Sequence, residues 1–191
     1  MLEDFIGFVD ALFPSISNDT KDKAQEAIRQ FKRDGQQFNY LTKDDAIEEL
    51  SQGDILDSIP FRYIDENGDE QVAVTYGIVL TTSCDIDHDD TILIASVPDL
   101  KDYKGKIDTI KQNQTLTYLY LPDFKMREKY VDFSLVNTYS SSLIKKAIEI
   151  GTIKRYASLS KVGYYLFLCK LSAFLLRRED AETQMKRLIS S

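Results

Sequence analysis

The sequence is poor in the residues and segments that several protein classes require. Its 191 residues include only two cysteines, Cys84 and Cys169, too few for the disulfide framework of a small secreted domain. Residues 1–4 are partly acidic, where a secretory or mitochondrial leader is basic. The apolar stretch 162–176 contains a lysine and is shorter than the roughly 20 residues that cross a membrane. We therefore expect a protein of the reducing cytoplasm with no membrane segment.

Cofactor-binding motifs are missing as well. The chain has no phosphate-binding glycine loop, no zinc-ligand spacing and no nucleophile elbow. Its 43% hydrophobic and 29% charged residues are ordinary values for a globular protein. We expect a folded domain that needs no cofactor, and composition alone does not identify a reaction.

The chain does carry an uneven distribution of charge. Residues 1–100 hold 7 basic and 22 acidic side chains, a balance of −15, and residues 101–191 hold 17 and 9, a balance of +8, which together give the net −7. Such an asymmetry indicates a basic half that binds a partner or single-stranded nucleic acid. It is equally typical of two halves that attract each other within one fold. The whole-chain pI of 4.8 argues against a dedicated nucleic-acid binder.

Helical patterns dominate the N-terminal segment, residues 1–52. Apolar residues recur at three- and four-residue spacing over 2–13 and again over 24–31, which predicts two amphipathic helices. Thr42 is a candidate N-cap for a third helix that ends near Gly53. We therefore treat residues 1–52 as a helical segment that precedes the main domain.

Strand patterns begin at residue 53. Asn67-Gly68 predicts a tight type I′ hairpin turn, because both residues tolerate positive φ, and Pro60 indicates a strand edge or a bulge. Short strands at roughly ten-residue spacing predict a small antiparallel barrel or sandwich. The predicted strands are Ile55–Ile64, Val72–Thr81, Thr91–Val97, Leu116–Leu121 and Tyr130–Val136.

The chain becomes helical again after these strands. Leu143–Ile148 predicts a short helix, and Ser158 or Ser160 is a candidate cap for a longer, almost wholly apolar helix from Lys161 to about residue 178. We predict an α+β fold in which a small antiparallel β-barrel with C-terminal helices, residues 53–191, is flanked by the N-terminal helices and packed against the apolar helix.

The densest cluster of reactive side chains follows the second predicted strand. Cys84, Asp85, Asp87 and His88 are all residue types that bind metals, so a divalent cation site is one hypothesis. A calcium loop is excluded, because its sixth and twelfth positions lack the required glycine and glutamate. The alternative is a solvated acidic loop between two strands.

Cys84 and His88 also suggest a nucleophile and its base, because they lie four residues apart. The neighbouring acidic residues oppose this, since they disfavour the thiolate. The alternative is that Cys84, at the end of a strand, is simply packed in the core. We expect Cys169, within the apolar helix, to be structural.

Basic residues alternate with aromatic residues in the C-terminal half. Lysines 101, 104, 106 and 111 surround Tyr103, and Lys154-Arg155-Tyr156 follows the short helix. Lys125, Arg127 and Lys129 lie beside further aromatic residues. This composition is typical of single-stranded nucleic-acid sites, and equally of a solvated surface.

The order of the strand motifs resembles the PemK/MazF family of small β-barrels. The motifs are Gly53-Asp54-Ile55-Leu56, the stretch Gly77–Thr81 and the stretch Ile92–Pro98, so that the resemblance covers residues 53–136. It implies a barrel and endoribonuclease activity, with a catalytic arginine before the second of these strands and a Ser or Thr after the next. The segment Val74–Gly77 has no arginine, and Ser96 matches the second position.

A second likeness concerns Thr81–Asp85, which is similar to a strand ending Ser-Gln-x-Cys-Asp in bacterial proteins of mobile-element and defence loci. It implies a bacterial stress, toxin–antitoxin or phage-defence setting. We therefore expect a non-enzymatic interaction module with a protein partner or a second copy of itself. The alternative is an endoribonuclease acting on single-stranded RNA, with His88 or Asp85 as base and Arg127 or Arg155 as the cation at the phosphate.

Overall fold

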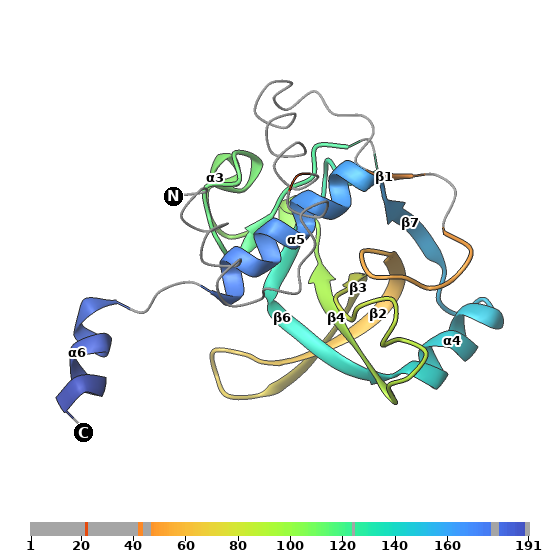
Figure 1. Cartoon of the computed structure of the whole chain (residues 1–191), viewed down its shortest axis with the longest axis horizontal. Helices are drawn as coiled ribbons and strands as arrows, with labels where there is room; N and C mark the ends of the chain where they lie inside the picture. Colours follow the sequence, from red (N-terminus) through yellow and green to blue (C-terminus); the bar gives the residue numbers. More distant parts are fainter. Residues whose placement is uncertain (1–21, 23–41, 44–46, 124, 177–179, 190–191) are drawn as a thin grey trace.

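The computed structural model describes residues 22, 42–43, 47–123, 125–176 and 180–189. It confirms an α+β fold built on a seven-stranded antiparallel sheet with the order β1-β7-β2-β3-β4-β6-β5 (Figure 1). The strands are β1 (Thr42–Lys43), β2 (Ile55–Ile64), β3 (Glu70–Val79), β4 (Thr91–Val97), β5 (Tyr118–Leu119), β6 (Val131–Ser140) and β7 (Arg155–Leu159). The helices are η1 (Leu100–Asp102), α3 (Ile107–Lys111), α4 (Ser141–Glu149), α5 (Lys161–Leu175) and α6 (Ala181–Ile189).

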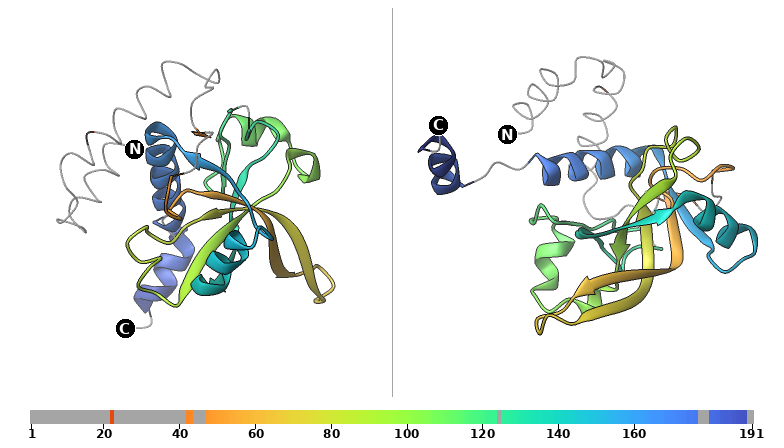
Figure 2. Two further views of the ribbon diagram at one scale, coloured as in Figure 1. Left: turned by 90° about the vertical axis from the view of Figure 1, so that its right-hand side faces the viewer. Right: turned by 90° about the horizontal axis from the view of Figure 1, so that it is seen from below.

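Strands β2 and β3 form the predicted hairpin, which extends away from the rest of the sheet (Figure 2). The predicted turn type is wrong. Gly68 has a φ of +86°, but Asn67 does not adopt positive φ, whereas a type I′ turn needs both. The amide of Gly68 instead donates to the carbonyl of Asp65, and the amide of Asn67 donates to the Asp65 carboxylate. The glycine thus closes a three-residue loop, and the aspartate holds it.

A bulge bends β2 before it enters the hairpin, as Pro60 had indicated. The register with β3 shifts between Leu56 and Ile59, and Ser58 there has a φ of +55°. The amide of Asp57 donates to the carbonyl of Lys154 just before the bulge. Residues 55 and 56 pair with β7, whereas among the described strands the part of β2 beyond the bulge pairs with β3 alone. The bulge therefore directs the second half of β2 away from β7.

Apolar clusters lie on both faces of the sheet. Leu166 and Phe167 of α5 join Ile78 of β3 in one buried cluster, and Ile144 of α4 joins Val79 in the other. Consecutive residues of β3 therefore face opposite layers, as strand geometry requires. Gly77 shares the face of Val79, where an added Cβ would come within 2.5 Å of Ile94. The views in Figure 2 show α5 and α4 against different parts of the sheet.

The sheet curls without closing into a barrel. Among the described residues no backbone ladder joins β2 to β6. Two side chains of β6 make the connection instead. The Asn137 amide accepts from the Arg62 amide (2.7 Å) and donates to the Arg62 carbonyl (3.2 Å), while the Tyr139 hydroxyl donates to the Pro60 carbonyl (2.7 Å). We call this junction between β2 and β6 the seam.

The predicted third helix from Thr42 to Gly53 is wrong. Thr42 and Lys43 form β1, paired with Leu159 and Ser158 of β7. The amide and hydroxyl of Thr42, which would have capped a helix, bind the Asp123 carboxylate at 3.1 and 2.6 Å. A long-range partner therefore outcompetes the local helical pattern. The helices predicted within residues 2–31 lie outside the described residues except Asp22, which is helical, and the boundary at residue 52 stays a prediction.

The C-terminal predictions are largely confirmed. The Ser160 hydroxyl accepts from the Gly163 amide and caps α5, which ends at Leu175. The short helix is α4. The strand predicted over 116–121 is reduced to the two residues of β5, and β7 was not predicted at all. Both are short strands, and β7 pairs with strands about a hundred residues earlier in the chain.

Candidate functional site

The outer face of the β2–β3 hairpin is exposed along its whole length. Directly opposed pairs place three residues of each strand on this face. Ile64, Val72 and Val74 are 65%, 57% and 67% exposed, although they are large apolar residues. We call this surface the hairpin face, and it consists of Pro60, Arg62, Ile64, Glu70, Val72 and Val74.

The sequence produces this face through the two-residue period of β3. Val72, Val74, Tyr76 and Ile78 lie on one side of the strand, because alternate residues share a face. Helix α5 and its cluster bury Ile78 and half-bury Tyr76, and the same apolar row then continues uncovered through the two valines. The strand thus carries more apolar surface than the described part of the chain covers.

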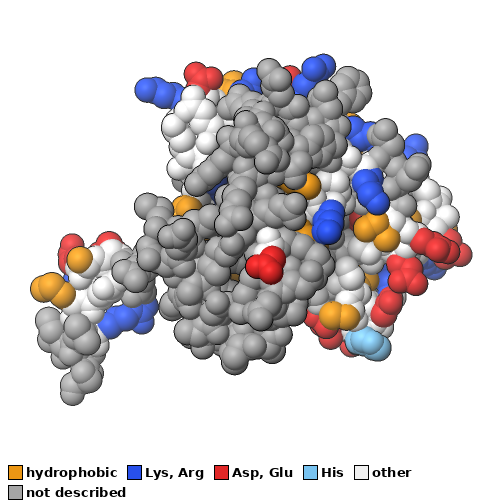
Figure 3. All heavy atoms as spheres, turned by 45° about the horizontal axis from the view of Figure 1, so that its top comes forward, with side chains coloured by type: hydrophobic (Ala, Val, Ile, Leu, Met, Phe, Trp, Pro, Cys, Tyr) orange, Lys and Arg blue, Asp and Glu red, His pale blue; other side chains and the backbone are white. Residues whose placement is uncertain are grey.

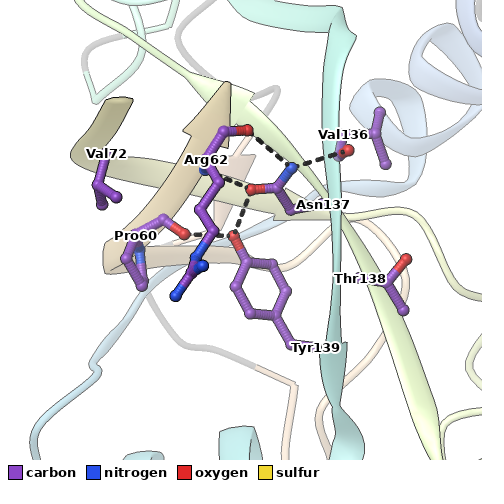
Figure 4. Close-up of a pocket in the computed structure, with 7 residues that line it drawn as sticks. All are labelled: Pro60, Arg62, Val72, Val136, Asn137, Thr138 and Tyr139. Carbon is purple, nitrogen blue, oxygen red and sulfur yellow. Dashed lines mark hydrogen bonds between the residues drawn. The ribbon is translucent and has the colours of Figure 1, made fainter. Parts of the chain in front are cut away.

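A hollow of about 510 Å³ adjoins the hairpin face at the seam (Figure 4). Arg62 is the charged residue among those that line it, and its guanidinium extends beside the Tyr139 ring (Figure 4). Burial raises the pKa of Tyr139 to about 12, so its hydroxyl stays protonated at neutral pH and keeps its bond to Pro60. The lining residues are Pro60, Arg62, Val72, Val136, Asn137, Thr138 and Tyr139.

Arg62 has an accessible charge. Its Nη1 lies 3.1 Å from Oε1 of Glu70, with the two side chains 74% and 58% exposed. Exposed pairs of this kind contribute only about 0–1 kcal/mol. The guanidinium is therefore available to a stronger anionic partner.

The Cys84 loop lies elsewhere, between β3 and β4. Figure 3 shows acidic side chains near the histidine on one side of the face. Nζ of Lys145 on α4 lies 2.5 Å from Asp87 and also donates to the carbonyl of Ile86. This lysine, mainly through its hydrogen bond, holds the pKa of Asp87 below its usual range. Ile86 is buried beneath the loop, so the loop is anchored by packing and by one lysine.

The metal hypothesis at Cys84, Asp85, Asp87 and His88 stays a prediction. In the described part of the chain, no group of three or more His, Cys, Asp and Glu side chains is arranged to hold a metal ion. The Cys84 thiol is exposed and lies 3.4 Å from the Thr82 hydroxyl and 3.6 Å from Asp85. These contacts tie the thiol to its neighbours in the loop.

Arg155, a candidate phosphate-binding cation, lies in a structural clamp. Its Nη2 is 2.7 Å from the Asp54 carboxylate, and the two side chains are 14% and 0% exposed. The same guanidinium donates to the carbonyls of residues 47, 48 and 49. The Ser158 hydroxyl completes the site on Asp54 at 2.5 Å. The arginine therefore holds the 47–49 segment against the sheet.

The second candidate cation, Arg127, is exposed on the loop after Asp123. Its amide donates to the Asp123 carbonyl, and its own carbonyl accepts from the Tyr120 hydroxyl. His88 and Asp85 lie on the Cys84 loop, where the His88 amide donates to the Asp85 carbonyl. The four residues proposed for RNA cleavage thus come from three separate segments.

Two tyrosine rings, one in each half of the chain, are covered by lysines of the basic half. Lys129 lies 4.2 Å from the ring centre of Tyr76, and Lys125 lies 5.2 Å from that of Tyr156. The two rings contact each other at 4.8 Å. Cation–π contacts of this kind hold the 125–129 loop on β3 and β7, and they occupy ring faces that a nucleobase would need.

Ion pairs join the acidic and basic halves. Asp54 pairs with Arg155, Asp87 with Lys145, and Asp99 with Lys129. Part of the charge asymmetry is therefore neutralised by ion pairs between the two halves of the same chain. Ser96, the position matched by the family resemblance, is buried in β4 at 2% exposure.

Comparison of the chain with protein-family models, with curated proteins and with solved structures finds no match. No helix in the described ranges has the length and apolar character needed to cross a membrane.

Sequence analysis missed the hairpin face. It located β2, β3 and the turn, but not which part of the apolar row on β3 would remain uncovered. The sequence signal for it was that the apolar residues of β3 continue up to the hairpin turn. A hairpin that runs past the end of the covering helix exposes whatever its last residues carry.

Proposed function

We propose that this chain is a non-enzymatic protein-interaction module whose partner contacts the hairpin face. The uncovered row of apolar side chains on β3 and β2 carries this proposal. Large apolar residues grouped on a projecting element are typical of binding surfaces. A bacterial cytoplasmic setting in stress response, toxin–antitoxin pairing or phage defence is part of the same proposal, as is a relation to the PemK/MazF family in which the sheet curls without closing.

The positions of the candidate catalytic residues support an interaction role over RNA cleavage. The Arg155 guanidinium, which RNA cleavage would need at a phosphate, is bound to Asp54 and to the carbonyls of residues 47–49. General acid–base catalysis requires its groups to meet at one substrate atom.

The test compares two variants in a bacterial cell that makes the full chain with an affinity tag. Val72→Thr/Val74→Thr removes apolar surface from the hairpin face while keeping residues that favour strands. Leu143→Thr is the matched control, because Leu143 is 66% exposed on α4. We expect one defined protein, identified by mass spectrometry, to copurify with the wild type and the control and to be lost with the double variant.

Two results would overturn the proposal. One is a monomer that retains the same proteins whether or not the valines are replaced. The other is turnover of labelled single-stranded RNA by the purified chain, lost on replacing His88 or Arg127 in a variant that stays folded.

A further inference from the structure

The backbone edge of β2 at the seam has hydrogen-bonding groups directed away from β3. The amide and carbonyl of Arg62 both bond to Asn137, on the side opposite β3. In an antiparallel pair, residues two apart direct their peptide groups to the same side, so Ile64 presents its amide and carbonyl along the same edge. Within the described residues, β7 pairs with this edge only at Ile55 and Leu56.

Asn137 occupies this edge as a peptide group would. Its side-chain amide accepts from one backbone amide and donates to the carbonyl of the same residue, the two bonds that a paired strand residue exchanges. Figure 4 shows the asparagine between β6 and Arg62. The edge of β2 is therefore paired at Arg62 by the Asn137 side chain, and an added strand would pair with it at Ile64.

The hollow beside this edge has a defined chemistry. It combines one cation, Arg62, with the apolar walls of Pro60, Val72 and Val136. A guanidinium binds a carboxylate through two parallel hydrogen bonds, and its present partner Glu70 is exposed. Alternate side chains of an added strand lie on the same face. A carboxylate and an apolar group two residues apart would therefore both enter the hollow.

We infer that the seam receives an extended acidic segment of the partner protein, which extends the pairing of the β2 edge from Asn137 to Ile64 and places a carboxylate on Arg62. This inference rests on the proposed function and adds the kind of segment that the partner supplies. The charge of Arg62 and the edge left open at Ile64 favour such a strand over a nucleic acid, whose bases would need open aromatic faces.

The experiment uses three fluorescein-labelled peptides of eleven residues, alternating Val and Thr, that differ only in the central residue, which is Glu, Gln or Lys. Fluorescence anisotropy with the full chain measures their affinities. We expect the Glu peptide to bind at least about tenfold more tightly than the Lys peptide, and Arg62→Glu to reverse this order. Lys146→Glu makes the same charge change on the exposed face of α4 and should leave the order unchanged.

Hydrogen exchange supplies the second readout. Bound Glu peptide should slow exchange of the Ile64 amide, while the amides of α4 stay unchanged. Equal affinity for the three peptides, an unchanged order in Arg62→Glu, or no protection at Ile64 would overturn the inference. If Arg62→Glu still copurifies the partner that Val72→Thr/Val74→Thr loses, the interaction module stands and the acidic-strand inference falls. If neither variant affects capture, the proposed function falls as well.

Discussion

At the scale of single residues, Arg155 matters most for the integrity of the fold. Its guanidinium neutralises the fully buried Asp54 and binds carbonyls of the 47–49 segment. A buried carboxylate without its partner is strongly destabilising, because no water replaces the lost charge. One side chain thus joins the 47–54 region to β7, about a hundred positions further along the chain.

We expect Arg155→Ala to lower the free energy of unfolding by about 3–5 kcal/mol. Urea denaturation followed by circular dichroism measures the change. Arg62→Ala is the matched control, because its ion pair with Glu70 is exposed and its loss should cost about 1 kcal/mol or less.

If Arg155→Ala is too unstable to purify, Arg155→Lys provides the comparison. It keeps a cation near Asp54 but lacks the planar fork that reaches several carbonyls, so its stability should lie between the other two. Equal stabilities for Arg155→Ala and Arg62→Ala would show that the clamp is not needed.

At the scale of elements, α5 is fixed to the sheet by more than its apolar face. Nζ of Lys170 donates to the carbonyls of Asn113 and Thr115, in the loop that leads to β5. Burial lowers the pKa of this lysine to about 8. A charged group in the middle of an apolar helix therefore titrates within an accessible range of pH.

We expect the stability of the wild type to rise between about pH 8 and pH 9. The lysine binds its proton less tightly in the folded state than in the unfolded state, where its pKa is 10.5, so stability increases as the folded form loses the proton first. From pH 9 the rise is offset, because burial raises the pKa of Cys169 from 9.0 to about 11, and above pH 10 the sign reverses, because burial also raises the pKa values of Tyr130 and Tyr139.

Urea denaturation at a series of pH values tests this expectation. Lys170→Met should abolish the rise and keep the fall above pH 10. Lys161→Met, on the exposed first turn of the same helix, should keep both. A rise that persists in Lys170→Met would assign the titration to another group.

Particular elements show how far sequence could lead. Helices α4 and α5, the β2–β3 hairpin and the bulge near Pro60 could be predicted, because period, caps and turn residues act over a few positions. The strand β1 could not, since Asp123 and β7 determine it from far along the chain. The same limit applied to Arg155, whose basic tripeptide suggested a nucleic-acid contact until its partner Asp54 was located. The hairpin face required knowing where α5 stops covering β3.

At the scale of the whole molecule, the opposed charges of the two halves meet inside the fold. Lys145 and Lys146 are neighbours on α4, and it is Lys145 that forms the ion pair with Asp87. The pair joins the Cys84 loop of the acidic half to a helix of the basic half.

We expect the pKa of Asp87 to return to its ordinary range in Lys145→Met, because the hydrogen bond from Lys145 is the main cause of its lowering. Carboxyl titration by nuclear magnetic resonance measures it. In the wild type the lowered pKa stabilises the fold above the ordinary aspartate pKa, and this contribution disappears as pH falls through the folded value. Lys146→Met should leave the titration of Asp87 unchanged; an equal shift in both variants would contradict a specific pair.

The clamp at Arg155 also has a consequence for synthesis. Its bonds to residues 47–49 span 106 to 108 positions of the chain. Since a ribosome adds about 5–20 residues per second, the early segment waits roughly 5–20 s for its arginine. During that interval β7, which pairs with both β1 and β2, has not been made. During synthesis the nascent protein therefore has Asp54 uncompensated and one side of its sheet open, and it is in this period that a chaperone would have most to protect.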